Sequence, residues 1–346
     1  MNATNGLASF DRIPAVDVAG LLSEDPIAQR AVADELGRAA REVGFFYVTG
    51  HGLPPQLFDK LLAVTKQFFA LPYRQKMQVY IGNSTNHRGY VPEGEEVFSG
   101  GTRDRKEAFD LGLELPADDE DYQRGNRLLG PNVWPALPTE MATVVNRYYA
   151  AVLDLGHVLL RGFALAIGQS PDTFTSYVTK PPSQLRLIHY PEDLDVTDSV
   201  GIGAHTDYEL FTLLRPTKPG LEVLNGAGTW VDVPVVPDAF VVNVGDLFET
   251  WTNGLFVATT HRVRKVTEER YSFPLFYNVD FDTVIEPLPQ FVRAGEPVLP
   301  ALCAGDHLFA QTAQSFTYLR ARLADGALRL PEGSLALSSF GRQESL

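Results

Sequence analysis

The sequence is poor in cysteine, in basic residues and in long apolar stretches. Cys303 is the single cysteine among 346 residues, which excludes an internal disulfide and fits a reducing cytoplasm. The longest apolar runs, such as 163–167, are far too short to span a bilayer. Residues 1–10 also lack the basic start and the apolar run of a secretory signal. We therefore expect a cytoplasmic protein without a membrane partner.

Acidic residues clearly outnumber basic ones. The chain has 29 Lys and Arg against 43 Asp and Glu, a formal net charge of −14. Phosphate contacts need a basic surface, so we expect no nucleic-acid partner. Hydrophobic residues make up 45% of the chain, which is enough for a sizeable core. We expect a single globular unit over 1–346, and the composition does not indicate an oligomeric state.

The N-terminal half is predicted to be largely helical. Apolar residues recur at helical spacing in three segments, 26–43, 54–69 and 138–167, with strand-like runs between them. Residues 76–101 are irregular and suit a loop over a site opening. We interpret 11–175 as an N-terminal helical and lid region. At the other end, 281–346 is predicted as a C-terminal segment with a closing helix at 307–323.

Five polar residues between positions 205 and 272 form the clearest motif. His205 and Asp207 are two positions apart in strand-like sequence, so their side chains point the same way. A third ligand, His261, must then come from a strand folded back beside the first. Two neutral imidazoles and one carboxylate suit ferrous iron and leave three coordination positions open. Arg270 and Ser272 repeat the two-residue spacing, and a guanidinium with a hydroxyl can grip one carboxylate.

From residue 183 onward the chain consists of short β-rich runs separated by Gly, Pro and Asn. These runs are 184–190, 202–206, 210–214, 221–225, 229–233, 239–243, 256–266 and 271–279. Such spacing is typical of an antiparallel sandwich or barrel. Together with the metal motif it predicts a mixed α/β fold with a mainly β core. The core would be a double-stranded β-helix, the cupin-like jelly roll, at 183–280, flanked by N-terminal and C-terminal helices.

The combination of His-x-Asp, a distal His and Arg-x-Ser resembles the isopenicillin N synthase-like family of non-haem iron, 2-oxoglutarate-dependent oxygenases. Further segments that carry the resemblance are 13–17, 44–52, 188–191, 243–246, 251–254 and 260–263. The resemblance implies Fe(II), 2-oxoglutarate as cosubstrate, and O₂. It also implies oxidation of an unactivated C–H bond of a small-molecule substrate, by hydroxylation, desaturation or cyclisation, with release of succinate and CO₂.

The resemblance also implies roles for individual residues. The far carboxylate of 2-oxoglutarate would bond Arg270 and Ser272, with Tyr190 adding a hydroxyl. Ile188 stands where the family often has an asparagine, so no side-chain amide is expected there. Six apolar residues are candidates for the cavity wall: Phe211, Leu213, Leu221, Val223, Phe273 and Leu275.

Two arginines are candidate substrate contacts. Arg186 shares a strand face with Tyr190, so if Tyr190 points inward Arg186 does too. An inward arginine needs an anion, either a carboxylate of substrate or cosubstrate or a structural partner from Asp or Glu. Arg88 lies in the loop-like segment and would be either a substrate contact or a solvated surface charge. Among the other histidines, we expect structural roles for His51 and His189 and exposed or capping positions for His87 and His307.

Other functions are compatible with parts of the pattern. An isopenicillin N synthase-like four-electron oxidase keeps the iron triad and the Arg-x-Ser pair but uses no 2-oxoglutarate. An ethylene-forming variant and a non-catalytic jelly-roll binding protein are further alternatives. Measurements of bound iron and of oxygen uptake would distinguish an oxygenase from the non-catalytic binding protein. Asp207 argues against a halogenase, which needs a vacant position where that carboxylate would bind.

Overall fold

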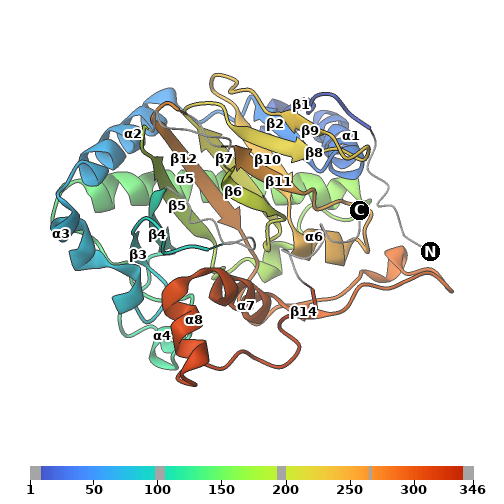
Figure 1. The fold of residues 1–346 in the computed structure, drawn as a ribbon. Helices are drawn as coiled ribbons and strands as arrows, with labels where there is room; N and C mark the ends of the chain where they lie inside the picture. The colour runs from blue at the N-terminus through green and yellow to red at the C-terminus, as the bar shows by residue number, and fades with distance from the viewer. Residues whose placement is uncertain (1–8, 98–105, 193–199, 265–266, 338–346) are drawn as a thin grey trace.

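The computed structural model describes residues 9–97, 106–192, 200–264 and 267–337. Figure 1 shows two sheets facing each other, with a long helix behind the larger sheet and a pair of C-terminal helices beside its lower end. This mainly β core with flanking helices is the predicted jelly-roll architecture. The prediction of the fold class is therefore confirmed.

Within the described residues, the larger sheet has eight strands. In spatial order they are β1 (Ala15–Asp17), β2 (Phe45–Thr49), β10 (Phe240–Val244), β7 (Phe211–Pro216), β12 (Arg270–Tyr277), β5 (Gln184–Tyr190), β4 (Glu107–Gly112) and β3 (Gly89–Val91). The sheet thus joins strands from both halves of the sequence. Most of the predicted strands of the jelly roll are recovered with ends shifted by a few residues.

The smaller sheet covers the other side of the core. Its strands are, in spatial order, β6 (Val200–His205), β11 (His261–Arg264), β8 (Leu221–Leu224) and β9 (Trp230–Asp232). A separate hairpin pairs β13 (Val284–Ile285) with β14 (Leu302–Cys303). The predicted strand at 256–266 is shorter in the structure, because described pairing begins only at His261.

The long central helix and two N-terminal helices pack on the face of the larger sheet that points away from the smaller one, whereas the first of the two C-terminal helices lines the cavity between the sheets. The helices are α1 (Pro26–Glu42), α2 (Pro55–Phe69), α3 (Tyr73–Lys76), α4 (Glu120–Gln123), α5 (Met141–Ala166), α6 (Asp246–Trp251), α7 (Ala304–Ser315) and α8 (Thr317–Ala324). α1 begins where expected, because Asp25 caps the backbone N–H of Ile27 at 2.9 Å and Pro26 occupies the first turn. α1 and α2 both pack on α5.

Helix α5 is long and apolar enough to cross a membrane by length and composition alone. Its apolar side is accounted for by packing: Val152, Leu159 and Phe163 belong to the buried core beneath the larger sheet. Half of the apolar stretch lies inside the fold, as in a core helix.

Alternation along the central strands separates this core from an internal cavity. On β12, Phe273 and Leu275 belong to the core on the helix side, whereas Pro274 and Phe276 line the cavity between the sheets. Phe211 and Leu213 on β7 also face the helices. The expected apolar wall was therefore wrong at these four positions, because they lie on the opposite face of the sheet from the cavity residues Ser272 and Thr212. Of the six candidates, Leu221 lines the cavity.

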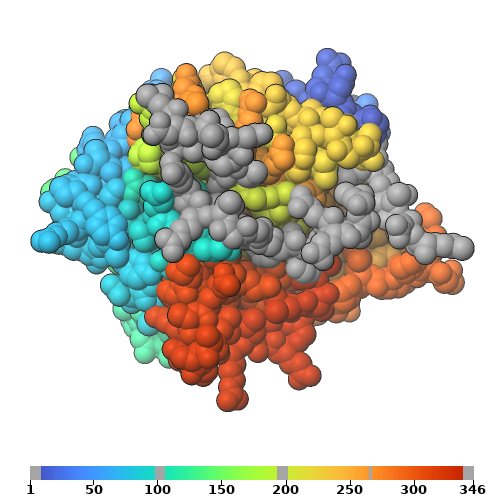
Figure 2. Space-filling view, in the orientation of Figure 1, coloured from blue at the N-terminus to red at the C-terminus, as the bar shows by residue number. Residues whose placement is uncertain are grey.

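The C-terminal helices lie directly against the segment that was predicted to be a loop. The described part of that segment, 76–97, contains β3 and is largely buried. The backbone of Glu96 forms an antiparallel β-bridge with Phe316. The side chain of the neighbouring Glu95 accepts hydrogen bonds from the Tyr318 backbone N–H at 3.0 Å and from the Tyr80 hydroxyl at 2.9 Å. In Figure 2 the C-terminal helices (red) border this N-terminal segment on the surface.

The predicted closing helix at 307–323 is two helices. Phe316 adopts an extended backbone conformation between α7 and α8, and its side chain lines the cavity. The break therefore places an aromatic ring in the cavity wall.

Candidate metal centre and cosubstrate pocket

The three expected metal ligands meet at one point between the sheets. β6 ends at His205 and β11 begins at His261, and the antiparallel register places these two residues opposite each other. Asp207 follows immediately, with its Oδ1 3.6 Å from His205 Nε2 and 3.5 Å from His261 Nε2. One ligand atom from each residue lies within 4.8 Å of the others. This spacing fits a single metal ion.

Both imidazoles are held in the form that binds a metal through Nε2. Nδ1 of His205 lies 2.8 Å from the Gly203 carbonyl, and Nδ1 of His261 lies 3.2 Å from the Thr259 carbonyl. Because a carbonyl can only accept, each Nδ1 carries a hydrogen, and Nε2, on the side of Asp207, is the ring atom that would bind a metal ion. Burial, assisted by the neighbouring His261, lowers the pKa of His205 to about 4, so its ring is neutral at physiological pH.

The carboxylate of Asp207 is oriented by two further side chains. Its Oδ2 accepts hydrogen bonds from Asn243 Nδ2 at 2.7 Å and from the Thr212 hydroxyl. Burial opposes the negative charge, but His261 outweighs it and the pKa of Asp207 is lowered. With Oδ2 occupied, Oδ1 alone faces the two imidazoles, which favours a single oxygen ligand and keeps the remaining positions open.

The three residues assigned to the cosubstrate converge at one end of the same cavity. Arg270 is opposite Tyr190 in the register of β12 and β5, and Ser272 is two residues further along. The Arg270 guanidinium is 1% exposed and lies 4.8 Å from the centre of the Tyr190 ring. Its Nε donates to the Lys218 carbonyl at 3.1 Å, whereas its Nη1 has no hydrogen-bond partner. A buried donor left unpaired is costly, so this end of the cavity fits a bound carboxylate.

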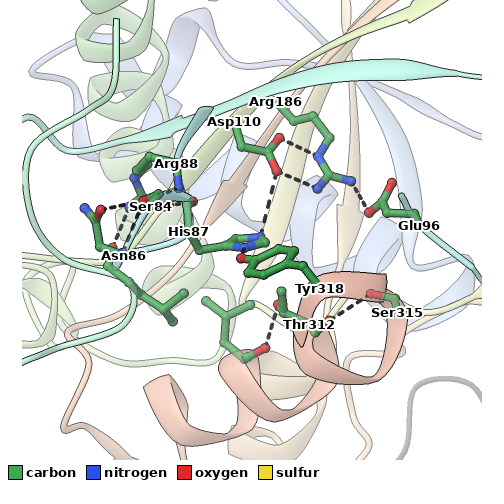
Figure 3. A network of polar contacts seen from close by, with 12 residues as sticks. Ser84, Asn86, His87, Arg88, Glu96, Asp110, Arg186, Thr312, Ser315 and Tyr318 are labelled. Atoms are coloured by element: carbon green, nitrogen blue, oxygen red, sulfur yellow. Dashed lines mark hydrogen bonds and ion pairs between the residues drawn. The ribbon is translucent and has the colours of Figure 1, made fainter. Parts of the chain in front are cut away.

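Arg186 points into the cavity as its shared face with Tyr190 predicted, but its charge is already paired. Its Nε and Nη2 both bond Asp110 at 2.7 Å, and its Nη1 bonds Glu96 at 2.6 Å (Figure 3). Lys106 approaches the other oxygen of Glu96 at 3.0 Å. The anion that this arginine needs is therefore supplied by the protein, and the structural alternative is the one observed. That Arg186 also contacts the substrate stays a prediction, since its side chain lines the cavity.

Arg88 was misjudged in both of its alternatives. It is 1% exposed, so it is no surface charge, and it does not line the cavity formed by the described residues. Its Nη1 and Nη2 donate to the carbonyls of His87 at 3.0 Å and Leu128 at 2.5 Å. Figure 3 shows it on the side of the network that is remote from Arg186. Its role is to tie backbone segments together.

His87 was expected to be exposed or capping and is instead buried in the cavity wall. Its Nδ1 is 2.6 Å from the Tyr318 hydroxyl, and its ring meets Phe316 edge-on. Its Nε2 is 3.8 Å from Asp110, too far for a hydrogen bond. His307 is also fully buried, whereas His51 and His189 have structural partners, as predicted.

Gln184 and Glu209 are among the polar cavity residues that were missed from the sequence. Gln184 continues the inward parity of Arg186 and Tyr190 on β5, so the strand pattern could have revealed it. Glu209 lies two residues beyond Asp207, and burial, with Asp207 nearby, raises its pKa well above the usual range. Gln184 Nε2 and Glu209 Oε2 are both buried without a hydrogen-bond partner.

Comparisons with known proteins agree with this geometry. Residues 181–279 match the 2OG-Fe(II) oxygenase superfamily, and 13–137 match the family described as non-haem dioxygenase in morphine synthesis N-terminal. A homoarginine-6-hydroxylase of Glycine max is 35% identical over 330 residues, covering 90% of this chain and 99% of that relative. The 2-oxoglutarate-dependent dioxygenase tropC of Talaromyces stipitatus is 36% identical, covering 80% and 89% respectively.

A solved structure shows the same fold with cosubstrate bound. A full-length Neurospora crassa protein in complex with alpha-KG and thymine is 26% identical and superimposes with a TM-score of 0.76, covering 94% of this chain and 99% of that chain. The chain therefore belongs to the 2OG-Fe(II) oxygenase superfamily. It is an oxidoreductase that uses Fe(II), 2-oxoglutarate and O₂ on a small-molecule substrate, and the oxidase alternative without 2-oxoglutarate is disfavoured.

Proposed function

We propose that His205, Asp207 and His261 bind the Fe(II), and that Arg270, Ser272 and Tyr190 hold the far carboxylate of 2-oxoglutarate. The unpartnered Nη1 of Arg270 carries the cosubstrate assignment, because it is a buried cation at the end of the cavity that contains the metal cluster. The neutral His205 ring and the two hydrogen bonds on Asp207 support the metal assignment.

When bound, Fe(II) with 2-oxoglutarate and O₂ supplies the oxidant for a substrate C–H bond, with succinate and CO₂ as products. The protein positions and shields the reaction. Thr212 and Asn243 fix Asp207, and the carbonyls of Gly203 and Thr259 fix the two imidazoles. Apolar side chains including Phe45, Ile202 and Phe276 exclude water from the cavity around them.

The activities of relatives favour hydroxylation as the reaction type, since several are homoarginine-6-hydroxylases. Desaturation or cyclisation would use the same site. We further propose that 183–280 is the catalytic core, with 11–175 and 281–346 as flanking parts of one unit. The single cysteine and the acidic balance support a cytoplasmic enzyme without nucleic-acid or membrane partners.

The test begins with metal and cosubstrate. Anaerobic mixing of the Fe(II) protein with 2-oxoglutarate should give the weak visible chelate band, and turnover should form one succinate per product. His205→Ala, Asp207→Ala and His261→Ala should each abolish turnover, because each removes one of three protein ligands. His189→Gln is a matched control, since that histidine bonds Glu107 and Glu269 outside the site and should leave iron content unchanged.

Near-normal iron content and activity in one of the three alanine variants would show that its residue is not a ligand. Product formed without 2-oxoglutarate, in a protein that gives no chelate band, would restore the four-electron oxidase.

A further inference from the structure

The substrate must meet the metal at the end of the cavity that is remote from Arg270. Thr212, which bonds Asp207, is opposite Phe276 on β12, and Phe276 is opposite Gln184 on β5. The metal cluster is therefore level with the first residues of β5. Tyr190, which faces Arg270, lies four residues beyond Arg186, roughly 13 Å along the strand. The side chains around Arg186 thus face the reacting end of the cavity.

These side chains form what we call the polar wall: His87, Glu96, Lys106, Asp110 and Arg186 (Figure 3 shows all but Lys106). Resting on the function proposed above, we propose that the polar wall selects a substrate that is uncharged where it meets the wall. It would recognise a carbonyl or hydroxyl oxygen, as in an amide, imide, ketone or phenol, through hydrogen bonds.

The charges within the polar wall balance one another. Among the described residues, the wall contains two cations and two carboxylates, and each is paired with another member of the wall. Arg186, the most exposed of the four, is only 8% exposed. A charged substrate group would therefore lose its water without gaining an opposite charge that is not already neutralised, which is unfavourable.

The pKa shifts of three wall residues agree with this charge balance, whereas burial raises the pKa of Asp110 in spite of Arg186. Burial alone would raise the pKa of Glu96, but Arg186 and Lys106 outweigh it and lower the value to about 2. Burial likewise opposes the charge on Arg186, but Asp110 and Glu96 raise its pKa well above the usual range. Burial, assisted by Arg186, lowers the pKa of His87 well below its usual value, so this ring is uncharged.

Arg186 and Gln184 both line the cavity and supply hydrogen-bond donors for a ligand. A guanidinium has five N–H groups, and Arg186 uses three of them on Asp110 and Glu96. Gln184 Nε2 is a buried donor without a partner. The remaining N–H groups of Arg186 and Gln184 Nε2 can donate to an oxygen on the ligand, whereas the unpartnered Glu209 Oε2 lies two residues beyond the metal-ligand candidate Asp207.

An apolar surface faces the same part of the cavity as the polar wall. Leu308 and Phe316 from the C-terminal helices and Phe276 from β12 line the cavity with the polar wall. A compact, mostly apolar body with one or two oxygens matches this mixture better than a flexible polyion does.

Substrate class can be tested by the perturbation of the chelate band when a third molecule binds anaerobically to the protein with Fe(II) and 2-oxoglutarate. The probes are isosteric pairs, benzamide with benzoate and acetophenone with benzoate, together with thymine and homoarginine. We expect the uncharged probes to perturb the band with dissociation constants at least tenfold below those of the charged ones. Equal or tighter binding of benzoate or homoarginine overturns the inference, and so does a set of uncharged probes none of which binds.

A variant that breaks the charge balance gives an independent test. Glu96→Gln removes one carboxylate isosterically and leaves the wall with a surplus positive charge. The ratio of benzoate to benzamide affinity should rise at least tenfold, while the affinity for 2-oxoglutarate at the Arg270 end stays the same. Glu222→Gln is the matched control, because it removes the same charge from an ion pair with Arg262 on the smaller sheet. An unchanged ratio in Glu96→Gln, in a protein that still gives the chelate band, overturns the inference.

The experiments can contradict the proposed function and the proposed substrate class independently. The chelate band forms before any probe is added, so its absence in the wild type contradicts the proposed function. A normal band that responds only to charged probes contradicts the substrate class alone.

Discussion

Two buried arginines face the same cavity from its two ends, and they are in opposite electrostatic situations. Arg186 has three hydrogen bonds to two carboxylates, both supplied by the protein. Arg270 is near a tyrosine ring and one carbonyl, and its Nη1 has no partner. Both side chains are buried, so burial alone does not distinguish a structural arginine from a ligand-binding one. The pairing of the guanidinium does.

Removing Arg186 should have the larger effect, a loss of stability of the folded protein. Arg186→Leu leaves Asp110 and Glu96 as buried carboxylates without their main counter-charge, which typically costs roughly 3–5 kcal/mol of unfolding free energy. Denaturant unfolding of the metal-free protein measures the loss. A variant as stable as the wild type would show that the ion pairs are not needed for folding.

Removing Arg270 should lower the affinity for 2-oxoglutarate and leave the stability of the fold nearly unchanged. Arg270→Leu deletes a buried charge with no carboxylate partner, so the unfolding free energy without ligand should change little. Its affinity for 2-oxoglutarate, read from the chelate band, should fall by a factor that corresponds to roughly 2–5 kcal/mol. Arg270→Lys should be intermediate, because it keeps the charge but loses the fork. Equal affinity in all three proteins would remove Arg270 from the cosubstrate site.

The smallest expected effect is the contribution of Glu96 to the unfolding free energy as the pH is lowered. The pKa of Glu96 is lowered to about 2 in the folded protein, from an ordinary value of 4.5. A depressed pKa stabilises the fold above the unfolded value, and this contribution is lost as pH falls from about 4.5 toward 2. It is at most roughly 3 kcal/mol. Glu96→Gln should therefore flatten the fall of unfolding free energy in that window, whereas Glu268→Gln, in an exposed ion pair, should not.

The metal cluster could be predicted because its information is local. His205 and Asp207 share a face through their spacing, and a single antiparallel pairing brings His261 opposite His205. The same holds for Arg270 and Ser272, whose parity also indicated that Phe273 and Leu275 must face the other way. That consequence of the strand pattern was available from the sequence and was missed.

The partners of Arg186 could not be read from the sequence. Asp110 and Glu96 are 76 and 90 residues away along the chain, on β4 and on the segment before the undescribed residues 98–105. They reach Arg186 only because β4 and β3 extend the jelly-roll sheet beyond β5. The same extension buries His87 and Arg88, which looked like loop residues.

Glu95 and Glu96 are neighbours whose side chains bond to different parts of the fold: Glu95 to the start of α8, and Glu96 to Arg186 in the cavity. A change in the C-terminal helices therefore reaches the reacting end of the cavity through one peptide unit. For protein engineering, this means that a C-terminal segment borrowed from a relative will fit only if it brings compatible residues for Glu95. Exchanging 92–97 and the C-terminal helices together is the smaller perturbation, although they are distant in the gene.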